Sequence, residues 1–174
     1  SLIIPNVFGP FCKPYYNSVI STFCHQIINE KKPKIEIDAS LKLIFIDELI
    51  EIIIKSFKQT DMMNIVNVPH YKPIKVSKIL NYIKSFKSSY IQNGTIPNLK
   101  NPFIKNLFNT FRSYLNYEEI YPFKLNINSD NRGSFIETMK LKSGGQVSFS
   151  TTRPNVTRGN HFHTNKVERF AVIK

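Results

Sequence analysis

The chain has 174 residues, of which 41% are hydrophobic and 13% aromatic, so it can bury a core and is not a disordered chain. Its formal net charge of +12 is of the kind that brings nucleic-acid binding into question. Most of the basic residues are lysines scattered along the chain, and the abundance of Lys, Asn and Ile is typical of an AT-rich genome. We therefore expect no nucleic-acid partner, although a basic surface attracts anionic substrates.

No apolar run approaches the roughly 18 residues that a membrane span requires. No basic leader with an apolar segment and a cleavage site precedes the first predicted strand. These absences predict a cytoplasmic protein without a membrane partner. The two cysteines, Cys12 and Cys24, have neither a disulfide pattern nor a metal-ligand spacing, so both are expected to be reduced thiols, with Cys24 packed against the core.

The first hundred residues alternate between short apolar runs and helical patterns. Residues 2–4 are predicted to form a buried strand, and an apolar stripe predicts a helix over about 16–30. Residues 41–46 follow as a strand, and Asp47 is placed to cap a helix that runs to about residue 58.

Two further helices are predicted before residue 118. Residues 64–68 form a strand candidate, and Ser77 opens a helix whose apolar positions face the core. A turn-rich stretch over 93–101 precedes another helical segment at 103–115.

After residue 121 the hydrophobic period changes to two, which predicts strands. The strands are expected at 123–128, 146–150 and 168–173, with Glu137 and Lys140 on a further strand. Turns are expected at 130–133, 143–145 and 153–155. The fold class is therefore α/β over the first two thirds of the chain and all-β over the last third.

Two of the four histidines lie in the stretch Arg158-Gly159-Asn160-His161-Phe162-His163, which Glu168 follows. In a β-strand, alternate side chains share a face, so His161 and His163 are predicted to point the same way and Phe162 the opposite way. A carboxylate at Glu168, brought back by the next strand, completes a set of ligands that suits Zn, Fe, Mn or Ni. For an isolated motif, two surface histidines near an unrelated glutamate are the alternative.

The flanking residues carry a resemblance to a known family. Asp130-x-Arg132-Gly133-x-Phe135-x-Glu137, Gly144-Gly145-Gln146-Val147-Ser148 and Thr157-Arg158-Gly159-Asn160-His161 together resemble the cupin sugar-nucleotide epimerases. More narrowly, they resemble the C-terminal domain of the CapF-type capsular polysaccharide enzymes. In the cupin barrel both histidines and the glutamate of this motif bind metal. Asn155 departs from the family pattern, which has a glycine there, and we expect a slightly altered turn.

The beginning of the chain resembles a second fold family. Pro5-Asn6-Val7-Phe8-Gly9-Pro10 resembles the segment that follows the catalytic Tyr-x-x-x-Lys of extended short-chain dehydrogenase/reductases (SDRs), whereas its prolines and glycine could equally be loop punctuation. Residues 13–19 match the CapF-type version, which covers the substrate at a helix start. Residues 46–49 and 103–115 resemble its strand-to-helix junction and its connecting helix. The resemblance implies three residues that bind the UDP-sugar: Asn6, Asn17 and Ser18.

The resemblance implies a Rossmann-type SDR part followed by the first strands of a cupin barrel. Residues 1–118 correspond to the C-terminal, substrate-binding part of the SDR domain and residues 119–174 to a truncated cupin domain. The CapF-type enzyme epimerises a 4-keto UDP-sugar at C3 with its cupin and reduces the ketone with NADPH, in UDP-N-acetyl-L-fucosamine synthesis. Its NADP site is expected upstream of these residues and its last cupin histidine downstream, so the fragment alone is expected to be inactive. The whole protein of which this chain would be a fragment is expected to be a homodimer.

Several residue roles stay open. His161 is either a metal ligand, with Zn²⁺ expected and a fourth ligand missing, or the general base, as in related metal-free epimerases. Arg158 is either a contact for a sugar or phosphate or part of a salt bridge. Asp130 and Arg132 are expected to shape the turn that opens the barrel. A metal-binding cupin without catalysis and a basic nucleic-acid-binding protein are the alternative functions.

Overall fold

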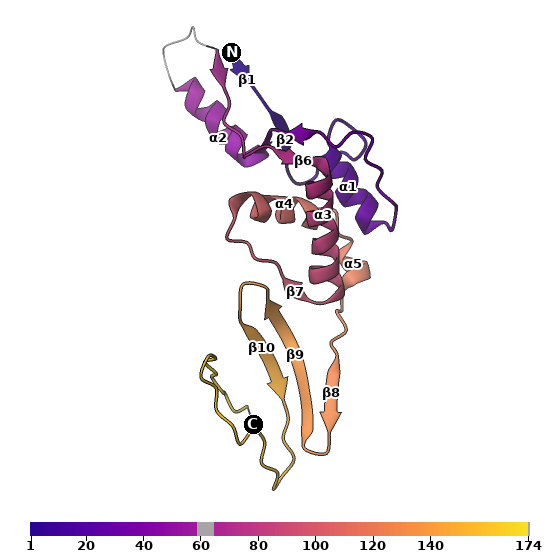
Figure 1. Cartoon of the computed structure of the whole chain (residues 1–174), viewed down its shortest axis with the longest axis vertical. Coiled ribbons are helices and arrows are strands. Elements are labelled where there is room, and N and C mark those ends of the chain that lie inside the picture. Colours follow the sequence, from indigo (N-terminus) through magenta and orange to yellow (C-terminus); the bar gives the residue numbers. More distant parts are fainter. Residues whose placement is uncertain (59–64, 174) are drawn as a thin grey trace.

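The computed structural model describes residues 1–58 and 65–173 as an elongated mixed α/β molecule (Figure 1). Helices and short strands fill one end, and a β-hairpin sheet with the last residues of the chain fills the other. Among the described residues, no helix is long and apolar enough to cross a bilayer.

The elements of the helical end follow in chain order. The first six are β1 (Leu2–Ile3), β2 (Asn6–Phe8), α1 (Val19–Ile28), β3 (Ser40–Leu41), β4 (Leu43–Phe45) and α2 (Ile46–Phe57). The next seven are β5 (Val66–Asn67), β6 (Ile74–Lys75), α3 (Val76–Phe86), the π-helix η1 (Lys87–Gln92), β7 (Thr95–Ile96), α4 (Pro102–Arg112) and α5 (Tyr117–Ile120). Three strands complete the described elements: β8 (Ile127–Asp130), β9 (Gly133–Leu141) and β10 (Gln146–Ser150).

Strand pairing divides the chain into small sheets. β1 pairs with β5 and β2 with β4, both in parallel, while β3 and β6 pair antiparallel. β9 is the long central strand of the hairpin sheet, with β8 and β10 antiparallel to it. β7 joins β9 in parallel, and the backbone N–H of Lys142 also donates to the carbonyl of Ile96. A strand from the helical end is thus part of the hairpin sheet.

The core lies where α1, α3 and α4 meet, as their apolar spacing predicted. Ile20 and Cys24 on α1, Ile79 on α3, and Leu107 and Phe111 on α4 are all almost completely buried. Cys24 is therefore packed as expected, and burial raises the pKa of its thiol well above the ordinary value. The Phe86 ring on α3 meets Phe108 of α4 edge-on and Phe111 of α4 at a tilt, which places aromatic contacts between the helices.

Two predicted helix starts need correction. α2 begins at Ile46, so Asp47 lies inside its first turn, and no side chain caps the helix. Asp47 still complements the positive end of the helix dipole. α3 begins at Val76, one residue before Ser77. The carboxylate of Asp38 accepts hydrogen bonds from the backbone and the hydroxyl of Ser77, at 2.8 and 2.9 Å.

The short strands differ from their predicted forms. β1 is a strand, but Ile3 is 55% exposed, so residues 2–4 are not buried as expected. The strand predicted over 41–46 is split into β3 and β4, because the chain turns from one partner strand to another between them. The strand predicted at 64–68 is shorter, at Val66–Asn67, and Asn64 lies outside the described residues.

Two of the strands predicted after residue 121 are also wrong. The strand expected over 123–128 begins only at Ile127, where pairing with β9 starts. The segment 168–173 has no strand structure. Val172 is 93% exposed and Phe170 84% exposed, and a strand needs a neighbour that accepts and donates its ladder hydrogen bonds. Residues 146–150 form β10 as predicted, and the turns at 130–133 and 143–145 join β8, β9 and β10.

Replacing Phe111 tests the position of the core. Phe111→Ala leaves a cavity where α4 contacts α1 and α3, so we expect the free energy of unfolding to fall by about 3–5 kcal/mol in urea titrations. Phe57→Ala is the matched control, because Phe57 is 83% exposed, and its change is expected within about 0.5 kcal/mol. Equal effects of the two substitutions would contradict this core.

Candidate functional site

The three residues assigned to a UDP-sugar lie around one small hollow, here called the amino-terminal pocket. Its volume is about 30 Å³, and its lining includes Asn6, Asn17 and Ser18 together with Leu41 and Leu43. Asn6 begins β2, and its side-chain amide donates to the carbonyl of Lys42 at 3.3 Å. Ser18 is the N-cap of α1, and its hydroxyl accepts from the backbone of Ser21. The fold thus brings Asn6 next to Asn17 and Ser18, which lie eleven and twelve positions later in the chain.

The loop that leads into this pocket has a strained backbone. Phe11, Tyr15 and Asn17 all have φ near +60°, a region that residues other than glycine occupy rarely. Such strain persists only where surrounding contacts enforce it, and it is often found at functional sites. Asn17, the last of these three residues, lines the pocket.

Polar contacts hold this loop against the core. The carbonyl of Cys12 accepts hydrogen bonds from the hydroxyls of Ser21 on α1, at 2.7 Å, and Tyr114, which follows α4, at 2.5 Å. The Tyr114 hydroxyl lies 2.8 Å from that of Ser21. Burial raises the pKa of Tyr114, so its phenol stays protonated and able to donate. The backbone N–H of Phe11 donates to the hydroxyl of Ser113.

A polar network joins three separate segments beside the first helices, and the sequence patterns did not predict it. The phenol of Tyr71 donates to the carboxylate of Glu48 on α2, and the amide of Asn106 on α4 donates to the Tyr71 oxygen at 2.9 Å. Desolvation and the neighbouring Glu48 raise the pKa of Tyr71 to about 12. Asn106, a polar residue at a core-facing helical position, was the one signal in the sequence. Because the three side chains hydrogen-bond to one another, we assign this network to stability.

His161, His163 and Glu168 lie close together, although they are not on strands. The two Nε2 atoms are 3.2 Å apart, and Nε2 of His163 is 3.6 Å from Oε2 of Glu168. Phe162 between them is 85% exposed. The two histidine rings therefore lie close together as predicted. The β-strand from which that prediction was made is not formed. Asn160 and Gly159 have positive φ, which bends the chain ahead of the histidines.

The separate distances between ligand atoms of His161, His163 and Glu168 fit a metal site better than the arrangement of all three residues does. Two ligand atoms on one tetrahedral zinc lie roughly 3.3–3.6 Å apart, given zinc–ligand bonds of about 2.0–2.2 Å. Both the His161–His163 and the His163–Glu168 distances are near that range, but no ion-pair contact joins His161 to Glu168 among the described residues. Within residues 1–58 and 65–173, no group of three or more His, Cys, Asp and Glu side chains is arranged as a metal site. The three residues are gathered but do not enclose one ion.

The carboxylate of Glu168 already has a cation beside it. Lys166 forms an ion pair with its Oε1, on the oxygen that does not face His163. The pKa of Glu168 is lowered, first by the hydrogen bond from Lys166 and then by the charges of Lys166, His163 and His161. Glu168 is therefore ionised at neutral pH, and a metal at this cluster would compete with Lys166 for it.

The guanidinium of Arg158 binds backbone carbonyls close to the β8–β9 turn. Its Nη1 donates to the carbonyl of Thr151 at 2.6 Å and weakly to that of Ser134 at 3.4 Å. The backbone of Thr151 can lie this close to residue 133 only because that residue is a glycine. A Cβ there would lie 2.1 Å from the carbonyl oxygen of Thr151. Among the described residues Arg158 has no salt bridge, and its guanidinium already binds two backbone carbonyls. Asn155 has φ of 61°, the conformation that a glycine would supply.

Asp130 and Arg132 shape the hairpin turn as expected. The Asp130 carboxylate accepts from the backbone of Arg132 at 2.8 Å and from its guanidinium at 2.6 and 3.0 Å. These bonds lower the pKa of Asp130 to about 2. Both side chains are partly exposed, so the pair orders the turn and does not form a buried charge site.

Comparisons with known proteins agree with the motifs. The family described as the polysaccharide biosynthesis C-terminal domain matches residues 128–174. The chain is also similar to CapF-type proteins along nearly its whole length. It is 34% identical to the UDP-2-acetamido-2,6-beta-L-arabino-hexul-4-ose reductase of Pseudomonas aeruginosa, over 98% of this chain and 46% of that protein.

Solved structures give the same relationship. The capsular polysaccharide assembling protein CapF from Staphylococcus aureus superposes with a TM-score of 0.78 at 34% identity, over 94% of this chain and 45% of that one. CapF with the inhibitor 3-isopropenyl-tropolone gives the same TM-score and identity, with coverage of 93% and 48%. The resemblance to CapF-type proteins and the mixed α/β fold are thereby confirmed. The chain spans about half the length of the relatives it matches.

Removing one partner of the hairpin turn should change its titration. Arg132→Ala is expected to raise the pKa of Asp130 from about 2 part of the way toward 3.8, because the backbone hydrogen bond remains. The folded-state pKa lies below the unfolded one, so the contribution of Asp130 to stability is complete above about pH 4 and is lost as pH falls toward 2. Carboxyl ¹³C NMR measures both values. Arg169→Ala is the control, and an unchanged Asp130 in Arg132→Ala would contradict the assignment.

Proposed function

We propose that this chain is part of a nucleotide-sugar-modifying enzyme of the CapF type. The observation that carries the proposal is similarity to one relative across 98% of the chain, through both the helical end and the hairpin sheet. That relative is named as a UDP-sugar reductase. The proposed whole protein is bifunctional: it epimerises a UDP-sugar at C3 and reduces its 4-keto group with NADPH. The resemblance also leads us to propose a homodimer.

On the reductase side, residues 1–118 are proposed as the substrate-binding part of an SDR domain. Asn6, Asn17 and Ser18 line one small surface hollow, so a UDP-sugar lying across it can reach all three side chains. Amide and hydroxyl groups can donate to and accept from a UDP-sugar. The loop from Phe11 to Asn17 is held by the core and can order such a ligand without reorganising. No residue of this chain is assigned to NADP.

On the epimerase side, residues 119–174 are proposed as the first part of a cupin. Epimerisation next to a ketone removes a proton from C3 and returns one on the other face, and it needs a base and a means of holding the enolate charge. His161 is the proposed base. Its Nε2 lies 3.2 Å from Nε2 of His163, so the two rings can share a proton. Arg158 is kept as a proposed substrate contact through guanidinium N–H groups other than its Nη1.

A second candidate function is metal binding without catalysis, favoured by the approach of His163 to both His161 and Glu168. The observed set does not enclose an ion, so we derive no step of the reaction through a metal. If zinc binds here, these three residues would hold it, and it would stabilise negative charge on a bound carbonyl oxygen. The open ligand set predicts weak binding by the 174-residue chain.

Asn6→Ala tests the sugar-binding assignment. The loss of one neutral hydrogen bond is expected to weaken UDP-sugar binding about two- to tenfold in the intact protein, while NADPH affinity stays nearly unchanged. Isothermal titration calorimetry measures both. Asn109→Ala is the control, since Asn109 is exposed on α4 away from the pocket. Equal loss of both affinities would indicate a folding defect, and unchanged UDP-sugar affinity would refute the assignment.

His161→Ala and His163→Ala test the metal assignment. Each is expected to lower the zinc content of the intact protein, because one ligand carries a large share of the binding energy, whereas His70→Ala is expected to leave it unchanged. Lys166→Ala should strengthen zinc binding by freeing the Glu168 carboxylate. Metal analysis and zinc titration give the readout. Epimerisation in a protein free of zinc, iron, manganese and nickel would leave His161 as the base alone.

A further inference from the structure

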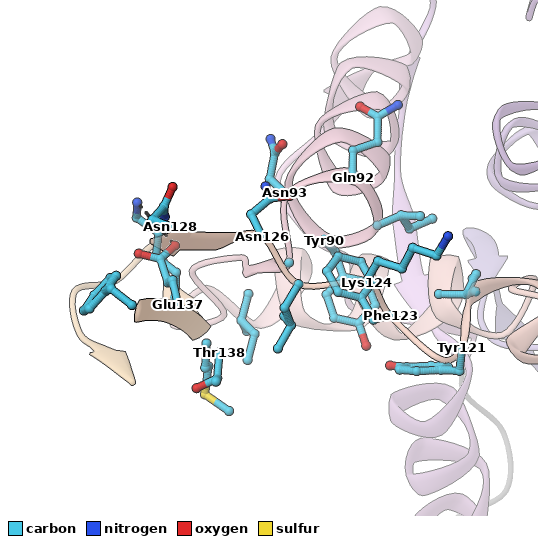
Figure 2. Close-up of a pocket in the computed structure, with 18 residues that line it drawn as sticks. Tyr90, Gln92, Asn93, Tyr121, Phe123, Lys124, Asn126, Asn128, Glu137 and Thr138 are labelled. Atoms are coloured by element: carbon cyan, nitrogen blue, oxygen red, sulfur yellow. Dashed lines mark ion pairs between the residues drawn. The ribbon is translucent and has the colours of Figure 1, made fainter. Parts of the chain in front are cut away.

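A larger cavity lies where the helical end meets the hairpin sheet, and none of the candidate residues above lines it. This junction pocket has a volume of about 670 Å³ (Figure 2). One wall comes from η1, another from β9, and the third from the chain between α5 and β8. Its volume is in the range of sites that bind small molecules, about 300–1,000 Å³.

The helical wall of the junction pocket is unusual. α3 changes into the π-helix η1 at Lys87, and η1 brings Tyr90, Ile91 and Gln92 to the pocket. π-helical turns are rare and occur frequently at functional sites. Here the wider turn is backed by α4, because the edge of the Tyr90 ring meets Phe108 at 5.1 Å between centroids.

Aromatic rings form part of the pocket lining. Tyr90 and Phe123 are half-buried, and Figure 2 shows both near the centre of the lining, with Tyr121 at one end. Gly94 lets the Phe123 ring approach the chain, since a Cβ there would be 3.3 Å from it. Desolvation and a hydrogen bond with Tyr121 raise the pKa of Tyr90, which keeps its phenol protonated. Flat apolar faces are therefore available beside hydroxyl groups.

Four amide side chains line the same pocket: Gln92, Asn93, Asn126 and Asn128. All four residues are exposed, and within the described residues no hydrogen bond uses their side-chain amides. Each amide can donate twice and accept twice. Amides can therefore hydrogen-bond to ligand groups that both donate and accept, such as hydroxyl groups.

The charges of the lining nearly balance. Lys140 lies 3.8 Å from the carboxylate of Glu137, which leaves Lys124 as the remaining charged side chain of the lining. A strongly anionic ligand would meet Glu137, and a cation would meet two lysines. The balance favours a ligand without large charge, held by hydrogen bonds and ring contacts.

We propose that the junction pocket binds a short saccharide. Sugar C–H faces pack against aromatic rings such as Tyr90 and Phe123, and sugar hydroxyls can pair with the amides, with Thr138 and with Glu137. The pocket's walls belong to both ends of the molecule, joined by the β7–β9 pair, so a bound saccharide contacts both. This site is separate from the amino-terminal pocket and from the histidine cluster, and it does not rest on the proposed function.

An NMR titration of the whole protein tests the proposal. The probes are N-acetylgalactosamine and N,N′-diacetylchitobiose at millimolar concentration, with UDP in a parallel titration. We expect the saccharides to shift the backbone signals of η1 and the side-chain amide signals of Asn126 and Asn128. Asn126→Ala combined with Asn128→Ala should weaken saccharide binding about tenfold, the effect of losing two hydrogen bonds. Asn109→Ala should leave it unchanged.

Tyr90→Phe supplies a second variant, which keeps the ring and removes the hydroxyl, and it should weaken binding less than the double amide variant. The proposal is overturned if neither saccharide shifts these signals. It is also overturned if the double variant binds as the unsubstituted protein does, or if UDP shifts the same signals and the saccharides do not. Spectra of each variant without ligand establish that the fold is retained.

Discussion

Helix α4 is the element on which the two pockets depend. Its buried face, with Leu107 and Phe111, fills the space between α1 and α3. Just beyond its end, Tyr114 holds the carbonyl of Cys12 and with it the loop of the amino-terminal pocket. On another side, Phe108 supports Tyr90 of the junction pocket. A well-packed core resists small displacements, so both pockets inherit their positions from one helix.

The two proposed chemical sites differ in how firmly they are held. The amino-terminal pocket has strained residues on a loop held by partly buried hydrogen bonds, which is a form of preorganisation. The histidine cluster lies on a segment without strand pairing, and the apolar side chains of Val167 and Val172 beside it are almost fully exposed. Its internal contacts are a pair of rings, the approach of His163 to Glu168 and an ion pair between Lys166 and Glu168 at the surface. Such contacts contribute little to stability when solvent screens them. The geometry of the cluster is therefore set locally.

The link between the ends of the molecule is a piece of sheet. β7 adds to the edge of β9 and brings the turn after η1 next to the hairpin (Figure 1). The backbone bond from Lys142 to Ile96 extends this pairing. Ile96 of β7 and Lys140 of β9 both line the junction pocket. A ligand in that pocket would contact η1 and β9 at once, which makes the relative position of the two ends part of any binding energy there.

The sequence by itself determined what depends on local pattern. The apolar spacing of α1, α3 and α4, the hairpin turns of the last third, and the nearness of His161 to His163 were all predictable, since neighbours along the chain decide them. The tertiary structure alone decided the contacts between distant residues. Examples are the cap of α3 by Asp38, the network of Glu48 with Tyr71, and the pairing of β7 with β9. It also decided that residues 168–173 are not a strand. A periodic pattern shows that a segment can pair, but the ladder hydrogen bonds come from a partner elsewhere in the chain.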